Sequence, residues 1–198
     1  MPRVRLFDKE KALKNAMELF WKKGFNGTST RDLVKATGLA TSSIYNTFGS
    51  KESLFFETLR HYQEAEHRKI NESLIGSASG LNAIRGVFEC MVQKEGTVEI
   101  NVMGCFMINS ITELAIHHPQ LSQFAANART IEIALLRELL QRAQQQCEIP
   151  AGKDLNQLAV YLHTIINGLK VSGVLAKDPK ELKSIIDVTI QSLKNNVI

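Results

Sequence analysis

A glycine at position 38, with a short helical segment on each side, is the feature that most constrains the fold of this chain. The Thr-Ser-Thr run at residues 28–30 can cap a helix that extends to residue 37, and Gly38 suits the left-handed position that ends such a helix. Thr41 and Ser42 offer a cap to a second short helix, which Gly49 ends. Two short helices joined by a tight turn have the dimensions of a helix-turn-helix, whose second helix enters the major groove of DNA.

The exposed side of this second helix carries small polar side chains that can approach base edges and phosphates. They are Thr41, Ser42, Ser43, Asn46 and Thr47. Large hydrophobic side chains at these positions would block entry into the groove. We assign Ile44 and Phe48, which lie on the opposite side, to the hydrophobic core.

The basic charge of the chain lies in the same region. Residues 1–51 carry ten Lys or Arg and four Asp or Glu, a net charge of +6, whereas the whole chain has a net charge of +4. The remaining residues, 52–198, therefore carry a net charge of −2. Basic side chains can neutralise phosphates and make DNA affinity depend on salt, while base contacts must come from the second short helix.

The segment that contains these helices closely resembles the TetR family of bacterial transcription regulators. The matching residues are Gly24-Phe25, Thr28-Ser29-Thr30-Arg31-Asp32-Leu33, Ala36, Gly38-Leu39, Ser43-Ile44-Tyr45, Phe48, Ser50-Lys51-Glu52 and Leu54. The pattern covers residues 8 to about 56, including an amphipathic helix expected over residues 8–23. Asn46 departs from the histidine that the family often has, which changes the details of phosphate hydrogen bonding.

The resemblance implies which side chains contact DNA. It places Thr28, Thr30 and Arg31 near one edge of the groove, and it places Lys51 on a phosphate at the start of the next helix. On or near the recognition helix it places Thr41, Ser42, Ser43, Tyr45, Asn46 and Thr47. For Tyr45 and Thr28 the alternative is that they only pack and cap.

Six more helices are expected after residue 50, over residues 51–74, 81–94, 101–117, 120–147, 154–176 and 179–195. Strand-like alternation with tight hairpin signals is absent from the sequence. We therefore predict an all-α fold of about nine helices. A helix-turn-helix DNA-binding domain spans residues 1–50, and a helical effector-binding and dimerisation domain spans residues 51–198. The helix over 51–74 belongs to both regions and can act as a lever between them.

The last two helices are apolar over more than one stripe, although a helix that faces a single core needs only one. We expect the second stripe to face another subunit, and the family resemblance likewise implies a two-fold dimer joined through these helices. The candidate interface residues are Leu158, Leu162, Ile165, Leu169, Ile185, Ile186, Thr189 and Leu193.

Aromatic and thioether side chains are frequent in the larger region, where they can line an effector pocket or fill a core. The candidate lining residues are Phe88, Met91, Met103, Cys105, Phe106, Met107 and Phe124. Four polar residues, Asn109, Glu113, His163 and Asn167, are candidates to orient a small-molecule effector.

Residues 104–109 resemble a Gly-Cys-Leu segment of one branch of the family, in which some members sense electrophiles or oxidants through the cysteine. A sensing cysteine needs a nearby cation or a helix N-terminus to stabilise its thiolate. Cys105 is expected in the first turns of its helix, but the sequence supplies no lysine close by. A structural, buried Cys105 is the other interpretation.

Motifs for catalysis or cofactor binding are scarce. Residues 76–80 have Ala78 where a nucleophile elbow needs serine, and no phosphate-binding loop or zinc motif is present. His61 and His67 are six residues apart, so they point in directions about 120° apart on a helix and do not form a metal site. We predict no enzyme activity, no cofactor and no metal.

The start of the chain lacks the pattern of a secretory signal, and we find no stretch of 18 apolar residues that could span a bilayer. The three cysteines are far apart, which disfavours structural disulfides. We therefore expect a cytoplasmic homodimer that binds palindromic double-stranded DNA, most simply a repressor released by a small-molecule effector. The alternatives are oxidant sensing through Cys105, an architectural DNA-binding protein, and an enzyme on a helical scaffold.

Overall fold

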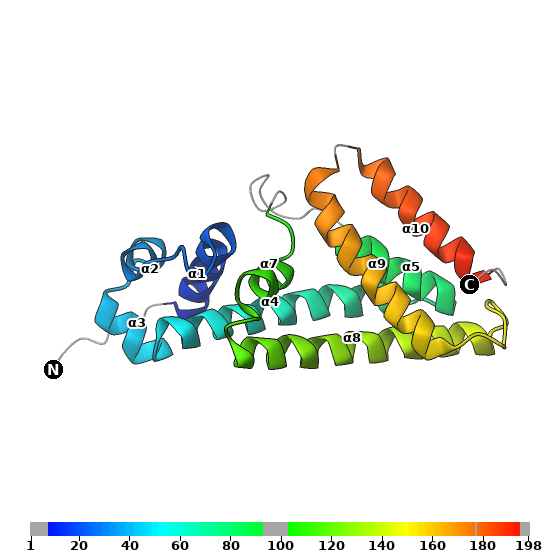
Figure 1. The fold of residues 1–198 in the computed structure, drawn as a ribbon, viewed down its shortest axis with the longest axis horizontal. Coiled ribbons are helices and arrows are strands. Elements are labelled where there is room, and N and C mark those ends of the chain that lie inside the picture. Colours follow the sequence, from blue (N-terminus) through cyan, green and yellow to red (C-terminus); the bar gives the residue numbers. More distant parts are fainter. Residues whose placement is uncertain (1–7, 93–102, 177, 195–198) are drawn as a thin grey trace. The chain divides into compact units, whose positions relative to one another are not determined.

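The computed structural model describes residues 8–92, 103–176 and 178–194, and within these ranges the chain forms nine α-helices and no strand. The helices, shown in Figure 1, are α1 (Lys9–Lys23), α2 (Thr30–Thr37), α3 (Thr41–Phe48), α4 (Lys51–Leu74), α5 (Gly80–Val92), α7 (Phe106–Leu114), α8 (Pro119–Gln145), α9 (Leu155–Leu175) and α10 (Pro179–Lys194). The predicted all-α fold is confirmed.

Most helix ends lie within a few residues of the predicted ones, because local signals set them. Asp8 caps α1 by accepting a hydrogen bond from the Lys11 N–H, and Asp154 caps α9 in the same way. The helix expected over 101–117 is shorter: α7 begins at Phe106, after Gly104, which has a φ of 71°. Cys105 is therefore the N-cap residue of α7 and not a residue of its first turns, while residues 101 and 102 lie outside the described residues.

The chain divides into two compact units, residues 1–65 and residues 66–198, and the boundary falls inside α4. Each unit has a core of its own. The sequence-based division between residues 50 and 51 stays a prediction about function, since α4 contributes residues to both units.

The core of the first unit joins α1, α2, α3 and the start of α4. Phe20, Leu33, Ile44 and Leu54, one from each helix, are at most 1% exposed. The Phe20 and Phe55 rings meet edge to face with their centroids 5.2 Å apart, a favourable aromatic geometry. Ile44 is buried, and so is Phe48 on the same face of α3, which confirms that both belong to the core.

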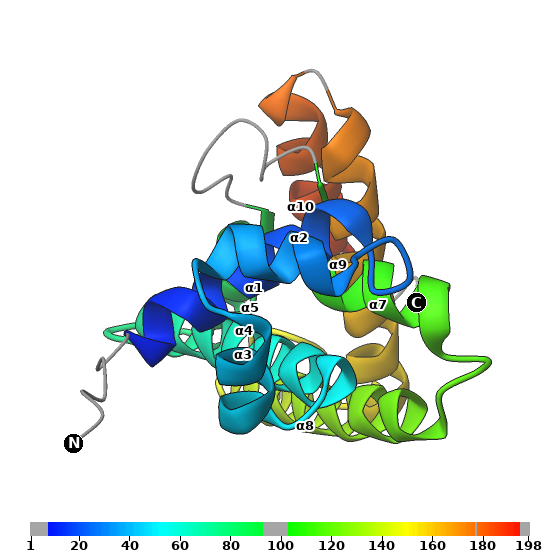
Figure 2. The same ribbon diagram turned by 90° about the vertical axis from the view of Figure 1, so that its left-hand side faces the viewer.

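In the second unit, α8 packs against α5, α7 and α9, and α10 packs against α5 and α9. Figure 1 shows α9 between α8 and α10, and Figure 2, turned by 90°, shows α9 and α10 as neighbours. The buried core residues include Ile84, Phe88, Leu136, Leu140, Leu162 and Ile186. Ile131 on α8 is 56% exposed. The buried side of α8 runs through Ala128, Leu136 and Leu139.

One described helix, α9, is long and apolar enough to cross a membrane by length and composition alone, a test that the core helix of a folded domain also passes. Its inner face, which includes Leu158, Leu162 and Leu169, lies in the core of the second unit. The apolar composition of α9 is thus partly explained by the neighbours α5, α8 and α10 that it contacts.

The predicted interface residues of the last two helices need a correction. Six of them are buried inside the subunit itself: Leu158, Leu162, Leu169, Ile186, Thr189 and Leu193. A side chain that is already buried has little surface left to offer a partner. The exposed apolar residues of these two helices are Val160, Val171, Leu175 and Val188.

Candidate nucleic-acid interface and buried polar cluster

Local hydrogen bonds and backbone geometry define both ends of α2, and the turn to α3 follows the second of them. At its start, the Ser29 hydroxyl accepts a hydrogen bond from the Asp32 N–H at 3.1 Å, and the Asp32 carboxylate accepts one from the Ser29 N–H at 3.0 Å. This reciprocal pair is a capping box. At its end, Gly38 has a φ of 71°, where a side chain would be strained, and its N–H donates to the Val34 carbonyl.

Asp32 also fixes α2 to the end of α1. Lys23 Nζ donates to Asp32 Oδ1 at 2.8 Å. The hydrogen bonds from Lys23 and Ser29 hold the pKa of the Asp32 carboxyl far below its usual range. The Asp32 carboxylate is therefore ionised at neutral pH and can accept the hydrogen bonds of the capping box.

Helix α3 presents a polar face to solvent. Thr41, Ser42 and Asn46 are exposed, and Ser43, Tyr45 and Thr47 are half-buried. The N-cap residue of α3 is Ala40, which makes no side-chain hydrogen bond, so Thr41 and Ser42 are first-turn residues and not caps as the sequence suggested. Both residues are exposed at the N-terminus of α3, the end of a helix that favours an anion.

The remaining predicted DNA contacts differ in their accessibility. Arg31 is exposed on α2. Lys51, the first residue of α4, holds its ammonium 4.3 Å from the centroid of the Phe25 ring. The Thr30 hydroxyl lies 2.9 Å from the Tyr45 hydroxyl. Thr28 is only 1% exposed and donates to the Gly24 carbonyl at 2.7 Å, so its side chain stabilises the turn before α2 and the predicted DNA contact of this side chain is withdrawn.

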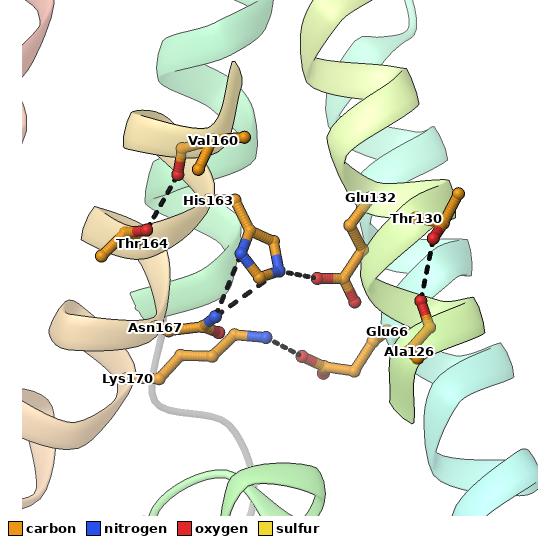
Figure 3. Close-up of polar contacts among 9 residues, drawn as sticks. All are labelled: Glu66, Ala126, Thr130, Glu132, Val160, His163, Thr164, Asn167 and Lys170. Atoms are coloured by element: carbon orange, nitrogen blue, oxygen red, sulfur yellow. Dashed lines mark hydrogen bonds and ion pairs between the residues drawn. The ribbon is translucent and has the colours of Figure 1, made fainter. Parts of the chain in front are cut away.

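Within the second unit, five polar side chains from α4, α8 and α9 converge, and Figure 3 shows them pointing toward one another. We call this group the polar cluster; it consists of Glu66, Glu132, His163, Asn167 and Lys170. Lys170 Nζ lies 3.6 Å from Glu66 Oε2, and Lys69 Nζ lies 3.4 Å from Glu66 Oε1. Over the described ranges, no group of three or more His, Cys, Asp or Glu side chains is arranged to hold a metal ion.

His163 contacts two other members of the polar cluster, Glu132 and Asn167. Its Nε2 lies 3.1 Å from Glu132 Oε2, and Asn167 Nδ2 lies 3.3 Å from its Nδ1. Because an ionised carboxylate only accepts hydrogen bonds, His163 Nε2 donates to Glu132 Oε2. The His163 ring therefore lies between the Glu132 carboxylate and the Asn167 amide.

The charges of the polar cluster stabilise one another against the cost of burial. Burial raises the pKa of the Glu132 carboxyl, but the hydrogen bond from His163 and the charge of Lys170 together bring the pKa below its ordinary value. Burial lowers the pKa of Lys170, whereas Cys105, Glu66 and Glu132 raise it by more. Both side chains are therefore charged at neutral pH. Lys170 also supplies the cation near Cys105 that the sequence did not reveal, because it comes from α9.

A small cavity of about 20 Å³ adjoins the polar cluster, which is room for about one water molecule. Glu132, His163 and Lys170 line one side of it. The rest of the wall is apolar and comes from α4, α5, α8 and α9: Ile70, Val87, Met91, Leu135, Leu136 and Ile166. A mostly apolar wall with a few convergent polar groups is typical of small-molecule sites.

Two family models match the chain in succession. "Bacterial regulatory proteins, tetR family" matches residues 12–58, and "Tetracyclin repressor-like, C-terminal domain" matches residues 80–189. The second match alone covers more than half of the chain. The chain belongs to the TetR family. The resemblance inferred from residues 24–54 is thereby confirmed, and the second match extends it over the helices that form the polar cluster.

Relatives and solved structures agree with this TetR assignment. The chain is 32% identical over 195 residues to the uncharacterised HTH-type transcriptional regulator YezE of Bacillus subtilis, covering 98% of this chain and 100% of that one. It is 29% identical over 189 residues to the HTH-type transcriptional repressor ComR of Escherichia coli, covering 96% and 90%. A cysteine mutant of the TetR-family regulator CifR, complexed with 26-base-pair operator DNA, superimposes with a TM-score of 0.85 at 26% identity, covering 97% and 100%.

The TetR match favours an effector-responsive regulator over oxidant sensing at Cys105. Of the effector candidates from the sequence, Met91 and His163 line the cavity, and Asn167 reaches it through His163. Phe88 and Phe106 are at most 1% exposed and fill the core, and Cys105 is buried. Asn109 is exposed and donates to the Met103 carbonyl. Four other candidates are half-buried and are not among the residues that line this cavity: Met103, Met107, Glu113 and Phe124.

Sequence reasoning missed Glu66, Glu132 and Lys170. Each of them is a charged residue on an otherwise apolar stripe: Glu132 lies four residues after Ala128 and four before Leu136, and Lys170 lies four residues after Ile166. Residues four apart share a helix face. A charged side chain on the buried stripe of a long helix was therefore the signal that could have found them.

Proposed function

We propose that this TetR-family protein is a transcriptional repressor that binds a palindromic DNA operator as a homodimer and leaves it when a small-molecule effector binds. The observation that carries the DNA-binding role is the polar face of α3, which a capping box and a left-handed glycine hold beside α2. The operator in the CifR complex and the repressor description of ComR support the same role.

The DNA contacts that we propose are grouped by what they do. Base edges are contacted from α3 by Thr41, Ser42, Ser43, Tyr45, Asn46 and Thr47. Phosphates are contacted by Thr30, Arg31 and Lys51. The first two lie at the start of α2, the third begins α4, and all three belong to the same unit as α3. Phosphate contacts position the protein on the duplex, whereas base contacts give sequence specificity.

A second subunit completes the proposed repressor. On α9, the exposed residues Val160, Gly168, Val171 and Leu175 recur at helical spacing and form one face. On α10, Val188 is 70% exposed. An apolar face of this kind fits a copy of itself across a two-fold axis. The dimer would place its two recognition helices roughly 34 to 36 Å apart, or a multiple of that distance, to reach successive major grooves.

Effector response follows from linkage between two conformations. An effector lowers operator affinity only to the extent that it binds the DNA-incompetent conformation more tightly. Helix α4 contributes its first part to the unit with α3 and its last part, including Glu66 and Ile70, to the unit with the cavity. We propose that α4 transmits the change. We further propose that the protein acts in the cytoplasm and has no catalytic activity.

Selection of bound fragments from random duplex DNA tests this function. We expect the wild-type protein to select a palindromic sequence that also occurs beside its own gene, and a reporter driven by that sequence to be repressed. Selection of unrelated sequences would indicate an architectural DNA-binding protein. Turnover of a bound compound would indicate an enzyme instead.

A further inference from the structure

The hydrogen-bonding capacity of the polar cluster is incompletely used at the cavity. Glu132 Oε2 accepts from His163, and the Glu132 side chain is 33% exposed, so this carboxylate can accept a further hydrogen bond. The Lys170 ammonium has three N–H groups; it contacts Glu66 Oε2, and its charge also interacts with Cys105 and Glu132. A hydrogen-bond acceptor residue, Glu132, and a donor residue, Lys170, therefore both line the same small space.

The charges around this space restrict the ligand that it can take. Glu66 and Glu132 are two carboxylates, and Lys170 and Lys69 are two ammonium groups that face Glu66. The charges of this group already balance. An added carboxylate would be repelled by Glu132 and Glu66, and an added ammonium would be repelled by Lys170, and each would lose its hydration on entering an apolar wall.

A hydroxyl group is the neutral group that fits both partners. It donates one hydrogen bond, here to Glu132, and accepts another, here from Lys170. Hydrogen bonds to charged partners are stronger than those between neutral groups. The apolar remainder of the wall, formed by residues such as Val87, Met91 and Leu136, suits a hydrocarbon body.

We propose that this cavity binds the effector, and that the effector is a neutral, largely apolar molecule with one hydroxyl group, a phenol or a hydrophobic alcohol. This inference rests on the proposed function. The cavity is smaller than such a molecule, so binding must widen it by displacing side chains of α5 and α8, such as Met91 and Leu135, which are half-buried and belong to its wall. The wall also includes Ile70 of α4, so the same widening acts on the helix shared by the two units.

The test compares three probes of one shape, which are 4-propylphenol, propylbenzene and 4-propylbenzoate, by calorimetric titration of the full-length protein. We expect 4-propylphenol to bind at least about tenfold more tightly than each of the others, because only its hydroxyl satisfies both Glu132 and Lys170. The proposal would be overturned by equal affinity for 4-propylphenol and propylbenzene, by tighter binding of 4-propylbenzoate than of 4-propylphenol, or by binding of none of the three.

Two variants locate the hydroxyl partner. The double variant Glu66→Gln/Lys170→Met removes an ion pair together with its donor, and Glu132→Met removes the acceptor while Lys170 stays. In each folded variant, the preference for 4-propylphenol over propylbenzene should fall to about one. Lys69→Met is the matched control, because Lys69 also pairs with Glu66 but does not line the cavity, and it should keep the preference. A preference that survives both cavity variants contradicts the assignment.

Operator affinity, measured on the same samples, separates this inference from the proposed function. We expect 4-propylphenol, but not propylbenzene at the same concentration, to weaken operator binding of the wild type. Selective phenol binding that leaves operator affinity unchanged would contradict the effector role and support the ligand class. Operator binding without any selective phenol binding would support the repressor and contradict the ligand class.

Discussion

The Tyr45 hydroxyl of the recognition helix lies 2.9 Å from the Thr30 hydroxyl at the start of α2. Thr30 and Tyr45 are fifteen residues apart in the sequence and lie on either side of the Gly38 turn. Their hydrogen bond therefore joins α2 to α3. Two other polar residues of α3, Ser42 and Asn46, are exposed. The Thr30 and Tyr45 side chains therefore fix the geometry of α3 and contribute to the proposed DNA surface.

Removing the hydroxyl of Tyr45 tests this structural role. Tyr45→Phe should lower the free energy of unfolding by about 0.5–1.5 kcal/mol, the net value of a typical hydrogen bond. Thr30→Val should have a similar effect, and the double variant should cost less than the sum of the two. Chemical denaturation measures all three. Strict additivity would show that the two hydroxyls do not stabilise each other.

Lys51 tests the electrostatic part of DNA binding. Lys51→Met keeps an apolar side chain over the Phe25 ring but removes the charge, so operator affinity should fall and its logarithmic salt dependence should lose about 0.9 of slope. Lys14→Met, at an exposed position of α1, is the control and should leave the slope unchanged. Fluorescence anisotropy over a range of salt concentrations checks both. An unchanged slope for Lys51→Met would remove Lys51 from the phosphate contacts.

The helix-turn-helix was predictable because its signals are local. Ser29, Asp32 and Gly38 act on backbone groups within a few residues of themselves, so the caps of α2 can be found in the sequence. The same reasoning failed for Thr28, because threonine before a helix can either face DNA or bond to the preceding turn, and the choice depends on the Gly24 carbonyl beside it. The start of α3 at Thr41 was likewise misassigned, because its N-cap residue, Ala40, makes no side-chain hydrogen bond that a sequence signal could reveal.

The proposed dimer is tested at exposed residues of the last two helices. Val171→Asp and Val188→Asp each place a charge on a face that we expect to be buried between subunits, so each should shift the protein from dimer to monomer. Ile116→Asp, at a position that is 91% exposed outside these helices, should remain dimeric. Sedimentation velocity distinguishes the states. Dimers of unchanged stability in both valine variants would place the interface elsewhere.

The ionised side chain of Glu132 should make the stability of the protein depend on pH in the acidic range. The pKa of Glu132 is lower in the folded protein than its ordinary value of 4.5. The ionised carboxylate therefore stabilises the fold at pH values above 4.5. This stabilisation is lost as the pH falls below 4.5 and through the pKa of the folded protein. Glu132→Gln should therefore reduce the loss of stability below pH 4.5 and be less stable than the wild type at pH 7. Glu138→Gln, at an exposed position of the same helix, is the control. Thermal unfolding at several pH values measures the stability of both variants. The same dependence of stability on pH in Glu132→Gln and Glu138→Gln would contradict this prediction.

The polar cluster was harder to predict than the DNA-binding surface because its members come from three helices. His163 and Asn167 were recognised as polar residues on an apolar helix, but their partner Glu132 lies 31 residues before His163 and Glu66 lies on α4. Nothing local in the sequence pairs these groups. Six of the eight predicted interface residues are buried within the subunit for a related reason, since both sides of α9 are apolar and only the packing of α5, α8 and α10 shows which side is inside.

The most direct measurement for the central claim compares the affinity of the wild-type protein for its selected operator and for a scrambled duplex of equal length and composition, at one physiological salt concentration. The account predicts that the operator binds at least about 10³-fold more tightly, the lower end for specific regulators. It also predicts that Asn46→Ala on the exposed face of α3 reduces this ratio while leaving affinity for the scrambled duplex unchanged. Equal affinity of the wild type for the two duplexes would contradict the account.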